Sequence, residues 1–252
     1  MAEQGRYLYA VCRSLDIAAL DGLRGLGDRP VEGVESDGLV GLVSAVDLDE
    51  YGEDGLRRNL ERLDWLETAA RGHDAVVQAA ALLAPTAPMR LATIFRDDDG
   101  VRRRLGEQAA RIHTVLDRVE GHEEWSVKVL THAAESRPEP VGAGGSGADY
   151  LRQRKQEQES RDTGLRDAHL VAERVHDALA ALAVATRRLA PQDPRLTGLS
   201  GTMVHNAAYL VPRLRSDEFA TAVGRAATDN LDVHVDARGP WPPYSFAMLD
   251  DQ

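Results

Sequence analysis

His169, Glu173 and His176 come nearest in this chain to a catalytic or metal-binding set. They stand at positions i, i+4 and i+7, so a helix through them places all three on one face. Imidazole and carboxylate groups at such spacing can bind transition metals. The His-Glu-x-x-His pattern of zinc hydrolases does not occur, however. We therefore favour a solvated polar helix face, and a metal-dependent enzyme that uses these three residues is the alternative.

Other residue patterns also fall short of a catalytic motif. Ser44 and Ser200 lack the Gly-x-Ser-x-Gly elbow of hydrolases. The glycines from Gly142 to Gly147 lack the Lys-Ser/Thr pair of a phosphate-binding loop and favour a flexible linker. Cys12 is the single cysteine and lies in an apolar run, where we expect it to be buried. We predict no catalytic residues, no metal and no cofactor.

The C-terminal segment 239–246 carries three aromatic residues on a stiffened backbone. It reads Gly-Pro-Trp-Pro-Pro-Tyr-Ser-Phe, and its three prolines fix φ and remove backbone donors. A rigid aromatic segment either seals a core or presents its rings to a partner. We expect Trp241, Tyr244 and Phe246 to pack between domains, with an exposed binding site as the alternative.

Two cationic residues complete the candidate partner-binding set. Lys128 lies in a run where Trp125, Val127 and Val129 alternate with polar residues, so it belongs to the opposite strand face. Arg90 lies in a short segment, 88–95, that we predict to be a strand. Each is either a solvent-facing charge or part of a binding surface. The candidates for partner contact are therefore Arg90, Lys128, Trp241, Tyr244 and Phe246.

Composition restricts the class of protein. The chain has 252 residues and a net charge of −11, with a pI of about 5.2. Nucleic-acid binding needs a basic surface, and docking on an anionic membrane needs one too, so we expect neither partner. No apolar run approaches the roughly 20 residues that span a bilayer. We expect a soluble protein of the cytoplasm.

The first half of the chain alternates strand-like and helix-like segments. An Asp-Gly turn between apolar runs 31–35 and 39–46 predicts a β-hairpin. Apolar residues at helical spacing predict a helix over 56–83, with a break near Gly72. The other predicted elements are a strand over 6–12, a short helix over 16–25, a strand over 88–95 and a helix over 101–119.

The second half has the same character. Residues 133–148 form the predicted flexible loop, and a long helix follows over 150–188. Strands are predicted over 125–130, 202–211 and 231–235, and a helix over 217–229. The fold class is α+β with two domains, 1–120 and 121–252, each a small, mostly antiparallel sheet with packed helices. We expect the second domain to be ferredoxin-like, with a long helical excursion.

Short segments along nearly the whole chain carry a family resemblance. They are Tyr7–Val11, Leu42–Ser44, Tyr51–Glu53, Asp64–Glu67 with His73, Pro88–Thr93, Glu124–Val129, Tyr150–Arg154 and Gly239–Phe246. Together these segments resemble the gas vesicle protein family GvpF/GvpL. The chain departs from the family pattern at Thr86-Ala87, where larger apolar residues are common, and at Ser126, where glycine is frequent.

This resemblance implies a two-domain accessory or minor structural protein of gas vesicle assembly. It implies binding to the hydrophobic GvpA-type shell protein, contact with other gas vesicle accessory proteins, and support for nucleation or growth of the vesicle. It implies no enzymatic activity, and a location at the gas vesicle or in the cytoplasm. A small-molecule-binding regulatory protein is the second alternative, because α+β sheets host many functions.

Overall fold

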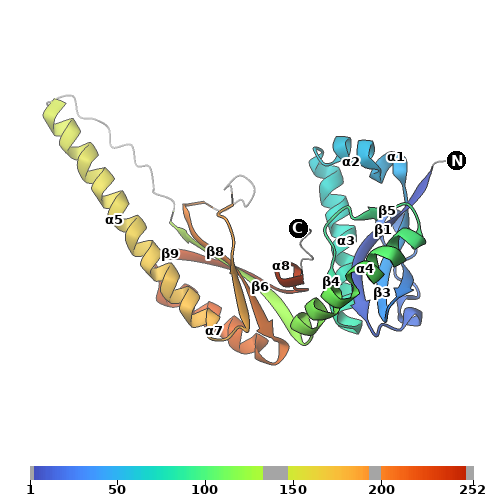
Figure 1. The fold of residues 1–252 in the computed structure, drawn as a ribbon. Coiled ribbons are helices and arrows are strands. Elements are labelled where there is room, and N and C mark those ends of the chain that lie inside the picture. The colour runs from blue at the N-terminus through green and yellow to red at the C-terminus, as the bar shows by residue number, and fades with distance from the viewer. Residues whose placement is uncertain (1–2, 133–146, 193–199, 248–252) are drawn as a thin grey trace. The chain divides into compact units, whose positions relative to one another are not determined.

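The computed structural model describes residues 3–132, 147–192 and 200–247 of the chain (Figure 1). They form two compact units. The first comprises Met1–Glu124 together with Trp241–Gln252, and the second comprises Trp125–Pro240. The C-terminal aromatic segment from Trp241 onward thus belongs to the first unit, whereas the sequence assigns it to the second.

The first unit is built on an antiparallel sheet whose central strand is β1 (Gln4–Arg13). The strand order is β2-β3-β1-β4, and β5 also pairs with β1. The remaining strands are β2 (Glu32–Ser36), β3 (Leu39–Asp47), β4 (Thr86–Pro88) and β5 (Ile94–Phe95).

The predicted β-hairpin is confirmed. Ser36 pairs with Leu39, so Asp37 and Gly38 form a two-residue turn between β2 and β3. Both turn residues have positive φ, 52° at Asp37 and 74° at Gly38. Asp-Gly is favoured at this turn because both positions need left-handed backbone.

Three expectations for the first unit are wrong in detail. The helix expected over 16–25 is only the 3₁₀ turn η1 (Ile17–Leu20), followed by η2 (Leu26–Asp28). The helix expected over 56–83 breaks near Arg62 rather than at Gly72, into α2 (Glu53–Asn59) and α3 (Leu63–Leu83), after the short α1 (Leu48–Tyr51).

The strand expected over 88–95 is also interrupted. Ala92 adopts a positive φ of 63°, which ends extended structure and separates β4 from β5. Its backbone N–H donates to the Tyr7 hydroxyl at 3.0 Å, so the turn is tied to the centre of the sheet. The helix predicted over 101–119 is present as α4 (Asp98–Val119), capped by the side chain of Asp97.

Helices α3 and α4 are the main helical cover of the first sheet. Val76, Val77 and Ala80 of α3 belong to the core that contains Tyr7 and Tyr9 of β1. The buried residues of α4 pack against other sheet positions. A Cβ at Gly41 of β3 would meet side-chain atoms of Leu8, Val101 and Leu105 at 3.1–3.3 Å. Glycine at this position therefore allows α4 to approach the sheet closely.

The second unit has the element order β-α-β-β-α-β, which confirms the ferredoxin-like prediction. Its sheet has the order β7-β8-β6-β9. The elements are β6 (His122–Thr131), α5 (Gly147–Ala180), β7 (Ala185–Arg188), β8 (Met203–Pro212), η3 (Arg213–Arg215), α7 (Ser216–Asp229) and β9 (Val233–Trp241).

The prediction that the long helix continues to residue 188 is wrong. Helix α5 ends at Ala180, and strand β7 begins five residues later. The Val184 N–H donates to the Leu210 carbonyl, and Ala185 pairs with Leu210 in an antiparallel ladder. Pairing with β8 therefore overrides the helical spacing of apolar residues in this stretch. Most of the predicted loop 133–148 lies outside the described residues.

The core of the second unit lies between its sheet and the two helices. Val127, Val129 and Tyr209 of the sheet pack with Val175 of α5 and Phe219 of α7. The first part of α5, by contrast, extends beyond the sheet of this unit (Figure 1). Its described side chains from Leu151 to Asp167 are exposed.

Candidate partner-binding surfaces

The C-terminal segment is anchored in the first unit through Glu124, which is buried. The carboxylate of Glu124 accepts a hydrogen bond from the Ser245 N–H at 2.7 Å and another from the Ser245 hydroxyl at 2.6 Å. Ser245 lies in the first turn of α8 (Tyr244–Ala247). A carboxylate is favourable there because it satisfies a backbone donor at a helix start.

Tyr244 and Phe246 are also engaged inside the first unit. The Tyr244 hydroxyl donates to Asp74 Oδ1 at 3.0 Å, and burial raises the pKa of this phenol. Phe246 is 5% exposed, and the Arg118 guanidinium carbon lies 5.6 Å from its ring centre. These two rings thus pack within the first unit.

Trp241 differs from the other two aromatic residues. It is 36% exposed, at the end of β9, so part of its indole is available to a partner. Arg90 is exposed in the turn between β4 and β5, and Lys128 is half-buried on β6. Arg90 and Trp241 belong to the first compact unit and Lys128 to the second. Within the first unit, Trp241 and Arg90 are the candidates with the greater exposure.

Of the three candidate metal ligands, two are hydrogen-bonded to other side chains and the third is exposed. Glu173 accepts two hydrogen bonds from the Arg188 guanidinium, at 2.7 and 2.5 Å. These bonds lower the pKa of Glu173 to about 2. His176 is hydrogen-bonded through Nδ1 to the Tyr209 hydroxyl at 2.8 Å, and His169 is exposed. In the described ranges, no group of three or more His, Cys, Asp or Glu is placed to hold a metal ion.

Tyr209 is shared by two histidines. The Nε2 atom of His205 lies 3.1 Å from the Tyr209 hydroxyl, and the rings of His176 and His205 have centres 5.0 Å apart. One hydroxyl donates a single hydrogen, so it donates to one ring and accepts from the other. Burial lowers the pKa of His205 to about 4 and also lowers that of His176. Both imidazoles are therefore neutral at pH 7.

The first unit contains a similar pair that the sequence analysis missed. The Tyr7 hydroxyl lies 3.0 Å from His73 Nδ1, and burial lowers the pKa of His73 to about 4. The same hydroxyl also accepts a hydrogen bond from the Ala92 N–H, and the tautomer of His73 decides which of the two side chains donates in the Tyr7–His73 bond. In both units a tyrosine on a central strand thus binds a histidine on a long helix. The spacing that places these residues on the buried faces of their strand and helix was the signal in the sequence that could have identified the pairs.

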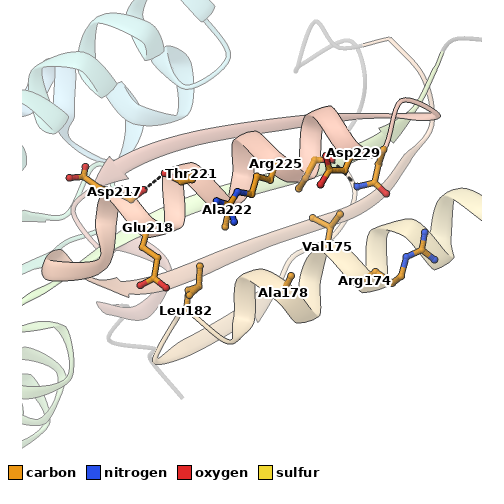
Figure 2. A pocket seen from close by; sticks show the side chains of 12 residues that line it. Arg174, Val175, Ala178, Leu182, Asp217, Glu218, Thr221, Ala222, Arg225 and Asp229 are labelled. Carbon is orange, nitrogen blue, oxygen red and sulfur yellow. Dashed lines mark hydrogen bonds between the residues drawn. The ribbon is translucent and has the colours of Figure 1, made fainter.

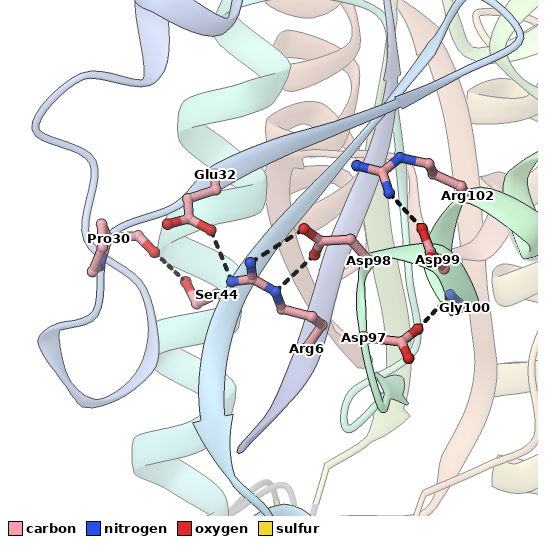
Figure 3. Close-up of polar contacts among 9 residues, drawn as sticks. All are labelled: Arg6, Pro30, Glu32, Ser44, Asp97, Asp98, Asp99, Gly100 and Arg102. Atoms are coloured by element: carbon pink, nitrogen blue, oxygen red, sulfur yellow. Dashed lines mark hydrogen bonds and ion pairs between the residues drawn. The ribbon is translucent and has the colours of Figure 1, made fainter. Parts of the chain in front are cut away.

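Two arginines of β1, Arg6 and Arg13, link the first sheet to α4, and Figure 3 shows the contacts of Arg6. Arg6 Nε lies 2.7 Å from Asp98 Oδ1 at the start of α4, and its Nη1 lies 2.8 Å from Glu32 Oε2. Arg13, at the other end of β1, pairs with Asp117 and Glu120 near the end of α4. These ion pairs link structural elements and form no catalytic set.

Comparison with known proteins decides the family. The family model described as "Gas vesicle synthesis protein GvpL/GvpF" matches residues 5–248. The chain belongs to this family. The match extends through α8, so it includes the C-terminal segment that packs into the first unit.

Individual members of the GvpL/GvpF family match along nearly the whole chain. The chain is 41% identical to gas vesicle protein L of Streptomyces sp. (strain CB03234), over 98% of this chain and 94% of the relative. It is 29% identical to gas vesicle protein F of the same strain, over 95% of this chain and 98% of the relative.

Solved structures of GvpF share the fold. The crystal structure of GvpF from Anabaena sp. PCC7120 superimposes with a TM-score of 0.71 at 21% identity, covering 98% of each chain. GvpF from Microcystis aeruginosa gives a TM-score of 0.69 at 20% identity, covering 97% of this chain and 99% of that one. GvpL/GvpF is a gas vesicle family rather than a known enzyme family. None of the described helices has the length and apolar character needed to cross a membrane.

Proposed function

We propose that this chain binds the GvpA-type shell protein and supports nucleation or growth of the gas vesicle. The observation that carries the proposal is the 41% identity to a gas vesicle protein L, which extends over nearly the full length of both chains. The lower identity to protein F favours an L-type role.

Keeping an apolar shell subunit from aggregating before assembly favours an acidic binding partner. A shell subunit with a large apolar face aggregates unless that face is covered before assembly. The net charge of −11 keeps complexes of this chain apart by mutual repulsion. The same charge disfavours nucleic acid as the partner.

Arg90, Lys128 and Trp241 are the proposed contact residues among the original candidates. Arg90 is exposed, Trp241 is 36% exposed and Lys128 is half-buried, so each can reach a partner without unfolding. Phe246 packs in the first unit and Tyr244 is hydrogen-bonded there, so we propose for these two an indirect role in positioning Trp241.

Co-purification tests this proposal. The affinity-tagged full-length chain is co-expressed with the shell protein, and captured shell protein is quantified. We expect stable capture by the wild-type chain, and capture reduced by a combined Arg90→Glu and Trp241→Ala substitution. No capture of shell protein that is demonstrably present in the soluble fraction would contradict direct binding.

Point substitutions are preferable to truncation in this experiment. A chain that ends before residue 122 lacks Glu124, Tyr244 and Phe246, which belong to the first compact unit. Loss of capture by such a fragment would therefore report damage to the first unit as well as loss of the second.

A further inference from the structure

A groove runs between α5 and α7 of the second unit (Figure 2). It has a volume of about 680 Å³ and is open to solvent along one side. All of its lining residues lie on these two helices or directly after them. They are Arg174, Val175, Ala178, Leu182, Asp217, Glu218, Thr221, Ala222, Arg225, Ala226, Asp229 and Asn230.

The floor of the groove is apolar and made largely of small side chains. Figure 2 shows Val175, Ala178 and Leu182 pointing toward α7, where Ala222 and Ala226 complete the apolar lining. Small side chains allow a third backbone to approach two packed helices closely, because interaxial distance depends on the side chains at the contact. An amphipathic helix with a narrow apolar stripe is the ligand shape that such a groove fits.

The length of the groove agrees with a helical ligand. Along α7 the lining residues extend from Asp217 to Asn230. At a rise of 1.5 Å per residue this stretch is about 20 Å long, which corresponds to about four turns of a docked helix.

The charges along the groove differ between its two ends. Arg215 Nη1 lies 3.5 Å from the Ala181 carbonyl, so the start of α7 lies beside the end of α5. Asp217 and Glu218 stand at this end, and Glu218 is paired with Arg215. Arg174 and Arg225 stand farther along, where Asp229 is the one lining carboxylate.

Glu218 is neutralised by Arg215, whereas three other charged residues of the groove have no such partner among the described residues. In the part of the chain that the structure describes, neither Arg174 nor Arg225 makes an ion pair, and Asp217 makes none either. Both arginines are exposed at the edge of an apolar surface. A docked helix would therefore lie with one end near the carboxylate of Asp217 and the other near the guanidinium groups of Arg174 and Arg225.

We propose that this groove binds an amphipathic helix of the shell protein, an inference that rests on the function proposed above. The helix lies with its amino end at Asp217 and its carboxyl end, or an acidic side chain near that end, at Arg174 and Arg225. This direction matches the positive amino end and negative carboxyl end of a helix macrodipole. The docked helix then runs parallel to α7.

The test uses the full-length chain and captured shell protein as the readout. One variant reverses the groove charges, Arg174→Glu with Arg225→Glu, and a second fills the groove, Ala178→Trp. Matched controls lie on the same helices outside the groove lining: Arg161→Glu with Arg166→Glu, and Ala227→Trp. All of these positions are exposed, and circular dichroism with a melting curve confirms that each variant folds.

We expect about a tenfold or greater loss of capture for the two groove variants, wild-type capture for both controls, and retained capture for Arg174→Lys with Arg225→Lys. Capture by the groove variants equal to wild type overturns the groove proposal and leaves the proposed function intact. Failure of the wild-type chain to capture shell protein overturns both. A groove-dependent change in the oligomeric state of the chain alone, with unchanged capture, assigns the groove to a second copy and overturns the proposal.

Discussion

Glu124 and Ser245 are joined by two hydrogen bonds although 121 residues separate them along the chain. Between them lies the whole of the second compact unit. The contact therefore returns the chain end to the first unit and explains why that unit is made of two stretches of sequence. The stability of the first unit therefore depends on Glu124 and Ser245, which stand before and after the second unit along the chain.

Substitution of Glu124 tests this link. Glu124→Ala leaves the Ser245 N–H without its acceptor and removes a buried, charged hydrogen-bond partner. We expect the free energy of unfolding to fall by about 3 kcal/mol, since each bond to a charged group contributes roughly 1.5–3 kcal/mol. Ser245→Ala removes one of the two bonds and should cost about half as much. Urea unfolding of both variants gives the comparison, and equal midpoints for wild type and Glu124→Ala would refute the link.

The aromatic residues of the C-terminal segment should differ in their contribution to stability. Phe246 is nearly fully buried, so Phe246→Ala should destabilise the protein by about 3–5 kcal/mol. Trp241 is 36% exposed, and Trp241→Ala should cost on the order of 1 kcal/mol. Thermal melting of the two variants separates these expectations. A larger loss for Trp241→Ala than for Phe246→Ala would show that the tryptophan supports the core.

The buried histidines make stability depend on pH. His73 and His205 are held neutral down to about pH 4, whereas an unfolded histidine takes up a proton near pH 6.5. Unfolding therefore binds protons between these values, and the free energy of unfolding should fall as pH drops from 6.5 to 4. His73 alone accounts for about 3 kcal/mol of this loss at pH 4. Urea midpoints from pH 8 to 4.5 measure the slope.

His73→Asn is the control for that slope. The Asn side-chain oxygen can accept the Tyr7 hydrogen bond in place of Nδ1 but cannot be protonated in this range. The variant should lose stability at neutral pH and show a weaker dependence between pH 6.5 and 4.5. Burial is the main cause of the lowered pKa of His205 and of His176; the charge of Arg188 also acts against their protonation, and that of Glu173 acts in its favour. An unchanged slope in His73→Asn would remove His73 as a source of the pH dependence.

Chelation should leave the protein unchanged. Glu173 is paired with Arg188 and His176 with Tyr209, so neither needs a metal ion for its contacts. We expect the melting temperature to be the same with and without EDTA. Glu173→Ala should cost less than about 1 kcal/mol, because the pair with Arg188 is half-exposed. A drop of several degrees on chelation, absent in His176→Ala, would revive the metal-site alternative.

The sequence predicted those parts of the fold that have a local cause. Asp37-Gly38 requires left-handed backbone at both positions, which fixes the hairpin between β2 and β3. The apolar spacing of α4 and α7 likewise reports one buried face for each helix. The ferredoxin-like second unit followed from the order of such elements.

The rest depended on contacts between distant residues. Strand β7 has a helix-like apolar pattern, and only its pairing with β8 makes it extended. Nothing near Glu124 in the sequence points to Ser245, and the sharing of Tyr209 by two histidines is visible only once α5 lies on β8. The candidate site residues differ in burial for the same reason. Phe246 is packed inside the first unit, whereas Trp241 keeps exposed surface.

The most direct test of the central claim is vesicle formation in a host that carries a complete gas vesicle gene cluster, with and without the gene for this chain. Intact vesicles are measured as the part of the light scattering that is lost when applied pressure collapses them. We predict that omission of the chain abolishes or sharply reduces this signal, and that the wild-type gene supplied separately restores it. An undiminished pressure-sensitive signal without the chain would contradict a role in vesicle assembly.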